Sequence, residues 1–324
     1  MSIRQFRPGD GAAIAAAWTA AAPADPVTHQ RLIELVLLDR NFDPAGLFIA
    51  VDEAAVDGPV VIGAAYAVRR RIAFDGDDLE PGQGWIPFFF VTPQHRRRGV
   101  GRDLLTTAMA WLASNGRRRV TFSSYTPNYF LPGLDEQRYP AAARLLASLG
   151  FTTDYQAVAM YRSLEGYAMP QPARERISAL RDAGFRFDSP TAEELTEVIE
   201  IASAEFNPDW GRAIREATLA GLGSDKIVAV WDRDGRALGW AMFGTYERVI
   251  DRFGPFGVLP TQRGLGLGEA LLHLTLERMR ACDAHSAWFL WTDQQSPAGR
   301  LYAKTGFSVT RTFSIQSASL GSRH

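Results

Sequence analysis

The sequence predicts an α/β fold in which one unit, an α+β mixed sheet covered by helices, occurs twice along the chain. Three observations predict it: the length of 324 residues, a motif that returns in the second half, and the same order of helix and strand patterns around both copies. At roughly 150 residues per domain, this length corresponds to about two domains. Each is large enough to bury a core of its own.

The repeat is clearest where VTPQHRRRGVGRDLL at residues 91–105 matches VLPTQRGLGLGEALL at residues 258–272, an offset of 258 − 91 = 167. Further on, LLASLGF at 145–151 matches LYAKTGF at 301–307, an offset of 301 − 145 = 156. The first copy therefore holds 167 − 156 = 11 additional residues between the two matches. They fall in SSYTPNYFLPGLDEQRYP, which mixes turn formers with aromatic and acidic residues, as functional loops often do.

The second copy shows the element order most clearly. TAEELTEVIEIASAEF has the spacing of an amphipathic helix, while KIVAVWD, ALGWAMFGTY and RFGPFGV are apolar and predict two hairpin strands and a third strand. The motif's glycines then open a helix at about 266–282. After it we expect a strand in SAWFLWT, a helix in SPAGRLYAKT and a last strand in FSVTRTFSI.

The predicted link between the copies is GYAMPQPARERISALRDAG, because glycine and proline break its first part and a charged helical pattern follows. This places an N-terminal domain at residues 1–165, a linker helix at 166–184 and a C-terminal domain at 185–324.

Composition narrows the class of partner. Lys plus Arg (35) nearly equals Asp plus Glu (36), so no net field favours a nucleic acid or an anionic membrane. No stretch approaches the roughly 20 apolar residues of a membrane span. A single cysteine, Cys282, and five histidines without ligand spacing predict no metal site. We expect a cytoplasmic protein, monomer or homodimer, that acts on a small molecule.

The repeated R-x-x-G-x-G motif follows a strand and opens a helix. Free N–H groups in such a loop, together with the helix dipole, form a site for a pyrophosphate, and glycine lets the phosphate approach the main chain. One such motif alone is weak evidence, but two in the same context are not coincidence. The candidates are Arg263, Gly264, Leu265, Gly266, Leu267 and Gly268 in the second copy and Val91, Arg96, Arg98, Gly99 and Gly101 in the first.

These motifs resemble the GNAT superfamily of N-acetyltransferases, whose signature [QR]-x-x-G-x-[GA] follows a strand that often ends V-x-P. LYAKTGF is similar to the family's L-Y-x-x-x-G-F. The resemblance implies two tandem acyl-CoA N-acyltransferase folds with acetyl-CoA as co-substrate and no metal. It also implies a bulged strand before the motif, with backbone groups for the pantetheine arm and the thioester; in RFGPFGV these would be Phe256, Gly257 and Val258.

The same resemblance implies that Tyr302, the tyrosine of LYAKTGF, is the general acid for the departing thiolate in a direct attack by an amine. The first copy has Leu146 at that place, which cannot donate a proton, so the chemistry is assigned to the second copy. For a base, three carboxylates stand near predicted strand ends: Glu247, Asp251 and Asp293.

Several alternatives stay open. The first copy would either bind coenzyme A without turnover, serve as a packing partner, or use Tyr125, Tyr129 or Tyr139 in place of the missing tyrosine. The acceptor is expected to be a primary amine, for instance of an amino sugar such as glucosamine; a polyamine, an antibiotic, an amino acid or a protein amine are others. A competing reading is a non-catalytic acyl-coenzyme A sensor or scaffold.

Overall fold

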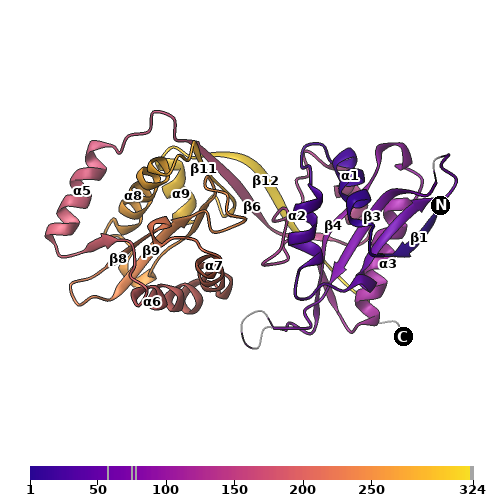
Figure 1. Cartoon of the computed structure of the whole chain (residues 1–324), viewed down its shortest axis with the longest axis horizontal. Coiled ribbons are helices and arrows are strands. Elements are labelled where there is room, and N and C mark those ends of the chain that lie inside the picture. Colours follow the sequence, from indigo (N-terminus) through magenta and orange to yellow (C-terminus); the bar gives the residue numbers. More distant parts are fainter. Residues whose placement is uncertain (57, 74–75, 77–78, 322–324) are drawn as a thin grey trace. The chain divides into compact units, whose positions relative to one another are not determined.

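The computed structural model describes residues 1–56, 58–73, 76 and 79–321, and it divides into two compact units (Figure 1). Unit 1 consists of Met1–Ala157 with Thr312–His324, and unit 2 consists of Val158–Arg311. This division is not the contiguous one expected from the sequence, because the last residues of the chain belong to the first unit. The predicted α/β fold with a strand-and-helix unit in each half is confirmed; the parallel strand pair β4–β5 makes the sheet of unit 1 mixed.

Unit 1 contains a sheet in the order β1-β2-β3-β4-β5-β12-β6. Strands β4 and β5 are parallel, and the strands β1 to β4 are antiparallel neighbours. Its elements are β1 (Ser2–Gln5), α1 (Gly11–Ala21), α2 (His29–Leu32), β2 (Leu47–Asp52), β3 (Val60–Val68), β4 (Gln83–Val91), α3 (Val100–Ser114), β5 (Arg119–Phe122), α4 (Pro140–Ser148), the first part of β6 (Thr152–Ser163) and the last part of β12 (Ser308–Ser319).

Both faces of this sheet are covered, which explains why its strands are continuously apolar. Alternate residues of a strand point to opposite faces. Leu47 and Ile49 of β2 therefore pack with helix α1, while Phe48 and Ala50 pack with helix α3.

Unit 2 contains the antiparallel sheet β10-β9-β8-β7, and strand β11 pairs with the second part of β6. Its remaining elements are α5 (Gln171–Asp182), β7 (Arg186–Asp188), α6 (Glu194–Ile201), α7 (Pro208–Leu219), β8 (Ile227–Trp231), β9 (Ala237–Phe243), β10 (Phe253–Val258), α8 (Leu267–Ala281), β11 (Ser286–Thr292) and α9 (Pro297–Lys304).

Strand β8 shows how this sheet is enclosed. Val228 and Val230 face a core that includes residues of α5, α8 and α9, whereas Ile227 and Ala229 face the core beneath α6 and α7. The helix, hairpin and strand patterns expected for the second copy are all present at these positions.

Strands β6 and β12 each contribute residues to both units. In unit 1, Gln316 of β12 lies opposite Phe122 of β5, and Ser317 Oγ donates to Asp154 of β6. In unit 2, Met160 of β6 lies opposite Phe289 of β11. Both strands are 12 residues long and are neighbours in one sheet, so each is long enough to contribute residues to both units.

A buried polar pair fixes helix α8 against the segment that precedes α5. The Tyr167 hydroxyl and Nδ1 of His273 are hydrogen-bonded at 2.7 Å, and both residues are buried. Burial lowers the pKa of His273; the Glu269 carboxylate opposes this shift, and the cations of Arg162 and Lys304 add to it. The folded unit therefore favours the neutral imidazole.

We predict that this pair makes stability fall in mild acid. The pKa of His273 is lower in the folded state than the ordinary value near 6.5, so its contribution is complete above about pH 6.5 and is lost as the pH falls below it. Melting temperatures between pH 7.5 and 5.5 should fall by a few degrees more for the wild type than for His273→Gln. The matched control is His285→Gln, because His285 is exposed; parallel curves for wild type and His273→Gln would contradict the prediction.

Candidate active site

Strands β10 and β11 leave an opening between them in unit 2. In the part of the chain that the structure describes, β10 pairs with β9 alone, and its contact with β11 is an isolated parallel bridge between Arg252 and Trp288. Beyond the bridge, the edge of β10 along Phe256–Val258 has no strand partner among these residues. Backbone groups on that edge are available to a ligand.

A bulge in β10 accompanies the opening. Phe253 lies opposite Phe243 and Phe256 lies opposite Ala241, so β10 holds one more residue than β9 over this stretch. Gly254 and Pro255 occupy the bulge, as the resemblance implied, because proline lacks the ladder N–H and glycine, at φ +107°, accepts the left-handed backbone.

The register then decides which backbone groups face the opening. The Leu259 N–H donates to the Leu238 carbonyl at 2.9 Å. Bonded and non-bonded pairs alternate along antiparallel strands, so Gly257 also turns its groups to β9, whereas Phe256 and Val258 turn theirs to the opening. A Cβ at Gly257 would lie 2.9 Å from Phe206, so packing also favours glycine there, and its backbone role in binding stays a prediction.

The loop after β10 has the shape of an anion site. Gly264 and Gly266 have φ of +87° and +88°, and Gly266 is the residue before the first turn of α8. Left-handed backbone at both positions favours glycine. The first N–H groups of α8 have no partner within the helix. Of the other predicted loop residues, Arg263 and Leu265 are exposed, Leu267 is buried in the core, and Gly268 lies against Phe256, Val258 and Leu301.

The equivalent loop of unit 1 keeps this shape with different residues. Gly99 has φ +84° before the first turn of α3, but the place of Gly264 is taken by Arg97 at φ +59°. A left-handed non-glycine residue costs roughly 1–2 kcal/mol. Arg96 donates from Nε to the Val91 carbonyl at 3.0 Å and from its guanidinium to the Ala21 carbonyl, so its side chain binds protein. Arg98 is exposed, and Gly101 lies against Val91 and Leu145.

Tyr302 lies on α9 inside an aromatic cluster that spans the opening. Its ring centroid is 4.5 Å from that of Phe289 on β11 and 5.9 Å from that of Phe256 on β10. Burial raises the pKa of the Tyr302 phenol above its ordinary value. The phenol makes no hydrogen bond to any described residue. A hydroxyl without a protein partner is available to a ligand.

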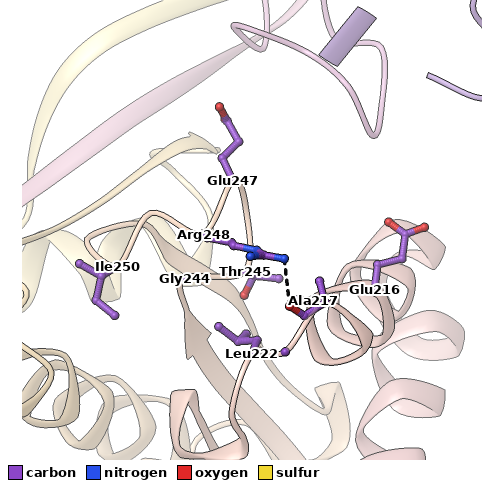
Figure 2. Close-up of a pocket in the computed structure, with 10 residues that line it drawn as sticks. Glu216, Ala217, Leu222, Gly244, Thr245, Glu247, Arg248 and Ile250 are labelled. Atoms are coloured by element: carbon purple, nitrogen blue, oxygen red, sulfur yellow. Dashed lines mark hydrogen bonds between the residues drawn. The ribbon is translucent and has the colours of Figure 1, made fainter. Parts of the chain in front are cut away.

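A cavity of about 350 Å³ lies near the start of β10 (Figure 2). Its walls come from the C-terminal end of α7 and from the segment that joins β9 to β10. Arg248 donates to the Ala220 carbonyl at 2.9 Å across it. The hydroxyl of Thr245 is buried in the wall and has no hydrogen-bond partner in the described chain. Other lining residues are Glu216, Ala217, Leu222, Glu247 and Ile250.

Comparison with known proteins identifies the family of this chain. The profile described as "Acetyltransferase (GNAT) family" matches residues 14–130 and 195–307, one match in each half. The chain belongs to the GNAT acetyltransferase family. The resemblance drawn from the motifs is thereby confirmed, and with it two GNAT domains in tandem and an N-acetyltransferase.

Individual relatives agree with this. The mycothiol acetyltransferase of Thermobispora bispora is 26% identical over 318 residues, 93% of each chain, and that of Gordonia bronchialis is 26% identical over 80% of each. A tandem GNAT protein from clavulanic acid biosynthesis superimposes with a TM-score of 0.65 at 16% identity, covering 100% of this chain and 99% of that one. The glucosamine N-acetyltransferase region of a fungal multi-domain beta-N-acetylglucosaminidase gives a TM-score of 0.77 at 17% identity over 98% of this chain, which spans 38% of that protein.

The three candidate carboxylates of the GNAT site have different surroundings. Asp251 accepts the N–H groups of His285 and Ser286 at 3.0 and 3.4 Å, so it fastens β10 to the start of β11. Asp293 accepts the N–H of Gln295 at 2.8 Å and closes the turn before α9. Glu247 lines the cavity and pairs with Arg252 at 2.8 Å. Of the three, Glu247 alone lines the cavity.

Unit 1 lacks a phenol at the position of Tyr302. Leu146 occupies that position on α4 and is fully buried. Tyr125 bonds to Asp39 at 3.2 Å, and Tyr139 bonds to Asp25, so both hydroxyls already have protein partners. Tyr129 also has a partner.

One residue that lies beside the glycine loop after β10 was not predicted from the sequence. Arg176 on α5 reaches Gly266, from which it is separated by 90 positions, 266 − 176. The pattern of α5 indicated a charged linker helix and gave no sign that one of its arginines would meet the loop.

Two further kinds of feature are absent from the described residues. No helix among them is long and apolar enough to cross a membrane. Within the same residues, no group of three or more His, Cys, Asp or Glu side chains stands close enough to hold a metal ion.

We predict that Gly266→Glu abolishes or severely weakens coenzyme A binding. The substitution strains a backbone at φ +88° and places a carboxylate where the loop offers N–H groups to an anion. Since charge-assisted hydrogen bonds contribute about 1.5–3 kcal/mol each, losing one or two weakens binding about 100-fold, measurable by calorimetry. Gly235→Glu, at φ +79° in the turn between β8 and β9, is the control for strain alone; equal weakening in both variants would count against the loop.

Proposed function

We propose that unit 2 transfers an acetyl group from acetyl-CoA to the primary amine of a small molecule by direct attack, with Tyr302 as general acid. The observation that carries the proposal is the buried phenol of Tyr302, which has no protein partner among the described residues and lies beside the open edge of β10. Acetyl-CoA supplies the thioester that makes the acetyl group transferable.

The residues of unit 2 fit this co-substrate. The left-handed backbone of Gly264 and Gly266 leaves room for a phosphate group where a Cβ would otherwise project. The free backbone groups of Phe256 and Val258 suit the amides of a pantetheine arm, which pair with a strand edge as another strand would. Both features lie on one path, because Gly268 lies against Phe256 and Val258.

Tyr302 would act as a protonated donor. Because its pKa lies above the ordinary value of about 10, the phenol keeps its proton throughout the neutral range. A thiol has a pKa near 8.5, so full transfer from the phenol to a free thiolate is uphill. As general acid, the phenol therefore hydrogen-bonds the sulfur as negative charge develops on it, and the proton that it gives to the thiolate is replaced by one that the attacking nitrogen loses.

The acceptor must present a neutral amine. For an amine with a pKa near 10.4, losing its proton at pH 7 costs roughly 4–5 kcal/mol. We assign the cavity lined by Arg248 to the acceptor, because this cavity adjoins the segment that leads into β10. Glu247, which also lines it, would attract the acceptor's ammonium group and remove its proton. Asp251 and Asp293 accept hydrogen bonds from backbone N–H groups, so we assign them a structural role in holding the site together.

For the acceptor class, the curated relatives and the sequence suggest two amines to test first. The relatives carry the name mycothiol acetyltransferase, which favours an amine related to mycothiol. The amino-sugar hypothesis is kept beside it, with glucosamine as the simplest probe. We further expect a cytoplasmic monomer or homodimer without a nucleic-acid or membrane partner.

We predict that Tyr302→Phe lowers kcat by about 100-fold or more, the usual range for loss of a general acid. Coenzyme A affinity and melting temperature should stay within error, because the lost hydroxyl has no described protein partner. Thiol release is the assay. Ionisation of Tyr302 should not lower the wild-type rate up to about pH 10, because its raised pKa keeps the phenol protonated. A variant that retains full kcat would remove the general-acid role.

We predict that Glu247→Gln lowers kcat/KM for the amine by about tenfold or more and leaves coenzyme A binding unchanged. A carboxylate at the cavity both attracts an ammonium group and accepts its proton, and an amide does neither. The control is Glu200→Gln, an exposed residue of α6. If the amine KM, the kcat and the pH profile all match wild type, Glu247 has no part in the reaction.

A further inference from the structure

Helix α5, which joins the two halves of the sequence, places an arginine against the cofactor loop of unit 2. If Gly266 carried a Cβ, that atom would lie 3.3 Å from both Cδ and Nη1 of Arg176. The side chain therefore lies directly beside the residue that precedes α8. The proposed function assigns no role to α5.

The position of Arg176 is fixed by the way α5 packs. Ala173, Ile177 and Leu180 of α5 are buried in the core of unit 2. Arg174 donates to the Met169 carbonyl at 3.2 Å and pairs with Glu277 of α8 at 3.3 Å. Residues two apart on a helix point in nearly opposite directions, about 200° around its axis. Arg174 therefore extends along α8 toward Glu277, and Arg176 extends toward the start of α8.

Charge at the start of α8 is unbalanced. The N-terminus of a helix carries about half a positive charge, which disfavours a neighbouring cation. Arg176 is nevertheless held there, it is exposed, and it has no ion pair or side-chain hydrogen bond among the described residues. The acidic residue in the first turn of α8, Glu269, is paired with Lys304 at 3.0 Å. An arginine in this setting is stabilised by an anion bound at the same place.

We propose that Arg176 is a positioning residue that pairs with the pyrophosphate of coenzyme A held by the Gly264–Gly268 loop, an inference that rests on the proposed function. The guanidinium presents a planar fork that matches two phosphate oxygens, so it adds direction as well as charge to the backbone N–H groups. Contact with Gly266, where those N–H groups converge, favours the pyrophosphate over the distant 3′-phosphate. The linker helix thereby becomes part of the cofactor site.

The test is calorimetric binding of coenzyme A and of 3′-dephospho-coenzyme A to the full chain and to Arg176→Gln. We expect about tenfold weaker binding of both ligands by the variant, and a smaller dependence of its Kd on salt concentration, because one ion pair is lost. Arg181→Gln is the matched control: Arg181 is an exposed arginine on the same helix, so its variant should bind as wild type does. Melting temperatures of both variants should match, since neither side chain is buried.

Each outcome has a distinct meaning. Equal Kd values for Arg176→Gln and wild type would overturn the inference alone and leave the proposed function standing. Weaker binding confined to coenzyme A and absent with the 3′-dephospho ligand would overturn the pyrophosphate assignment. Failure of the wild-type chain to bind either ligand would overturn the proposed function and the inference with it. Weaker binding of both ligands by Arg176→Gln, with normal binding by Arg181→Gln, would support the inference.

Discussion

The bulge at Gly254 and Pro255 is the constraint on which the site depends. It shifts the register of β10 by one residue, so that Phe256 and Val258 direct their backbone groups away from β9. The isolated bridge at Arg252 keeps one end of β10 beside β11, and the Tyr302 ring packs against Phe256 of β10 and Phe289 of β11. Without the bulge, the same residues would continue an ordinary ladder, and neither a free strand edge nor a phenol beside it would result.

Local features of this arrangement were predictable from the sequence, and distant contacts were not. The glycine loop, the helix after it and the irregular strand follow from residues that stand next to each other, and the repeat showed them twice. The position of Arg176 at Gly266 depends on how two helices cross. Asp251 accepts a hydrogen bond from a residue at the start of β11 that lies more than 30 positions later in the chain, and no local pattern predicts such a contact. Gly257 shows why the sequence alone leaves such a role open, because packing under Phe206 and a role in binding both favour a glycine in a strand.

The division of the chain into two units was also unpredictable, because it depends on distant contacts. The sequence predicted β12 as the last strand but gave neither its partners nor the position of β6, since strand pairing is decided by contacts far apart in the chain. These two long strands turn out to contribute residues to both units.

This sharing gives the first copy a structural role under the proposed function. The second part of β6, which follows directly from unit 1, pairs with β11 in unit 2, close to Phe289 and Tyr302. Loss of β6 would therefore remove the strand partner of β11. A copy with such a role needs neither a phenol nor a second left-handed glycine, which agrees with Leu146 at the place of Tyr302 and Arg97 at the place of Gly264.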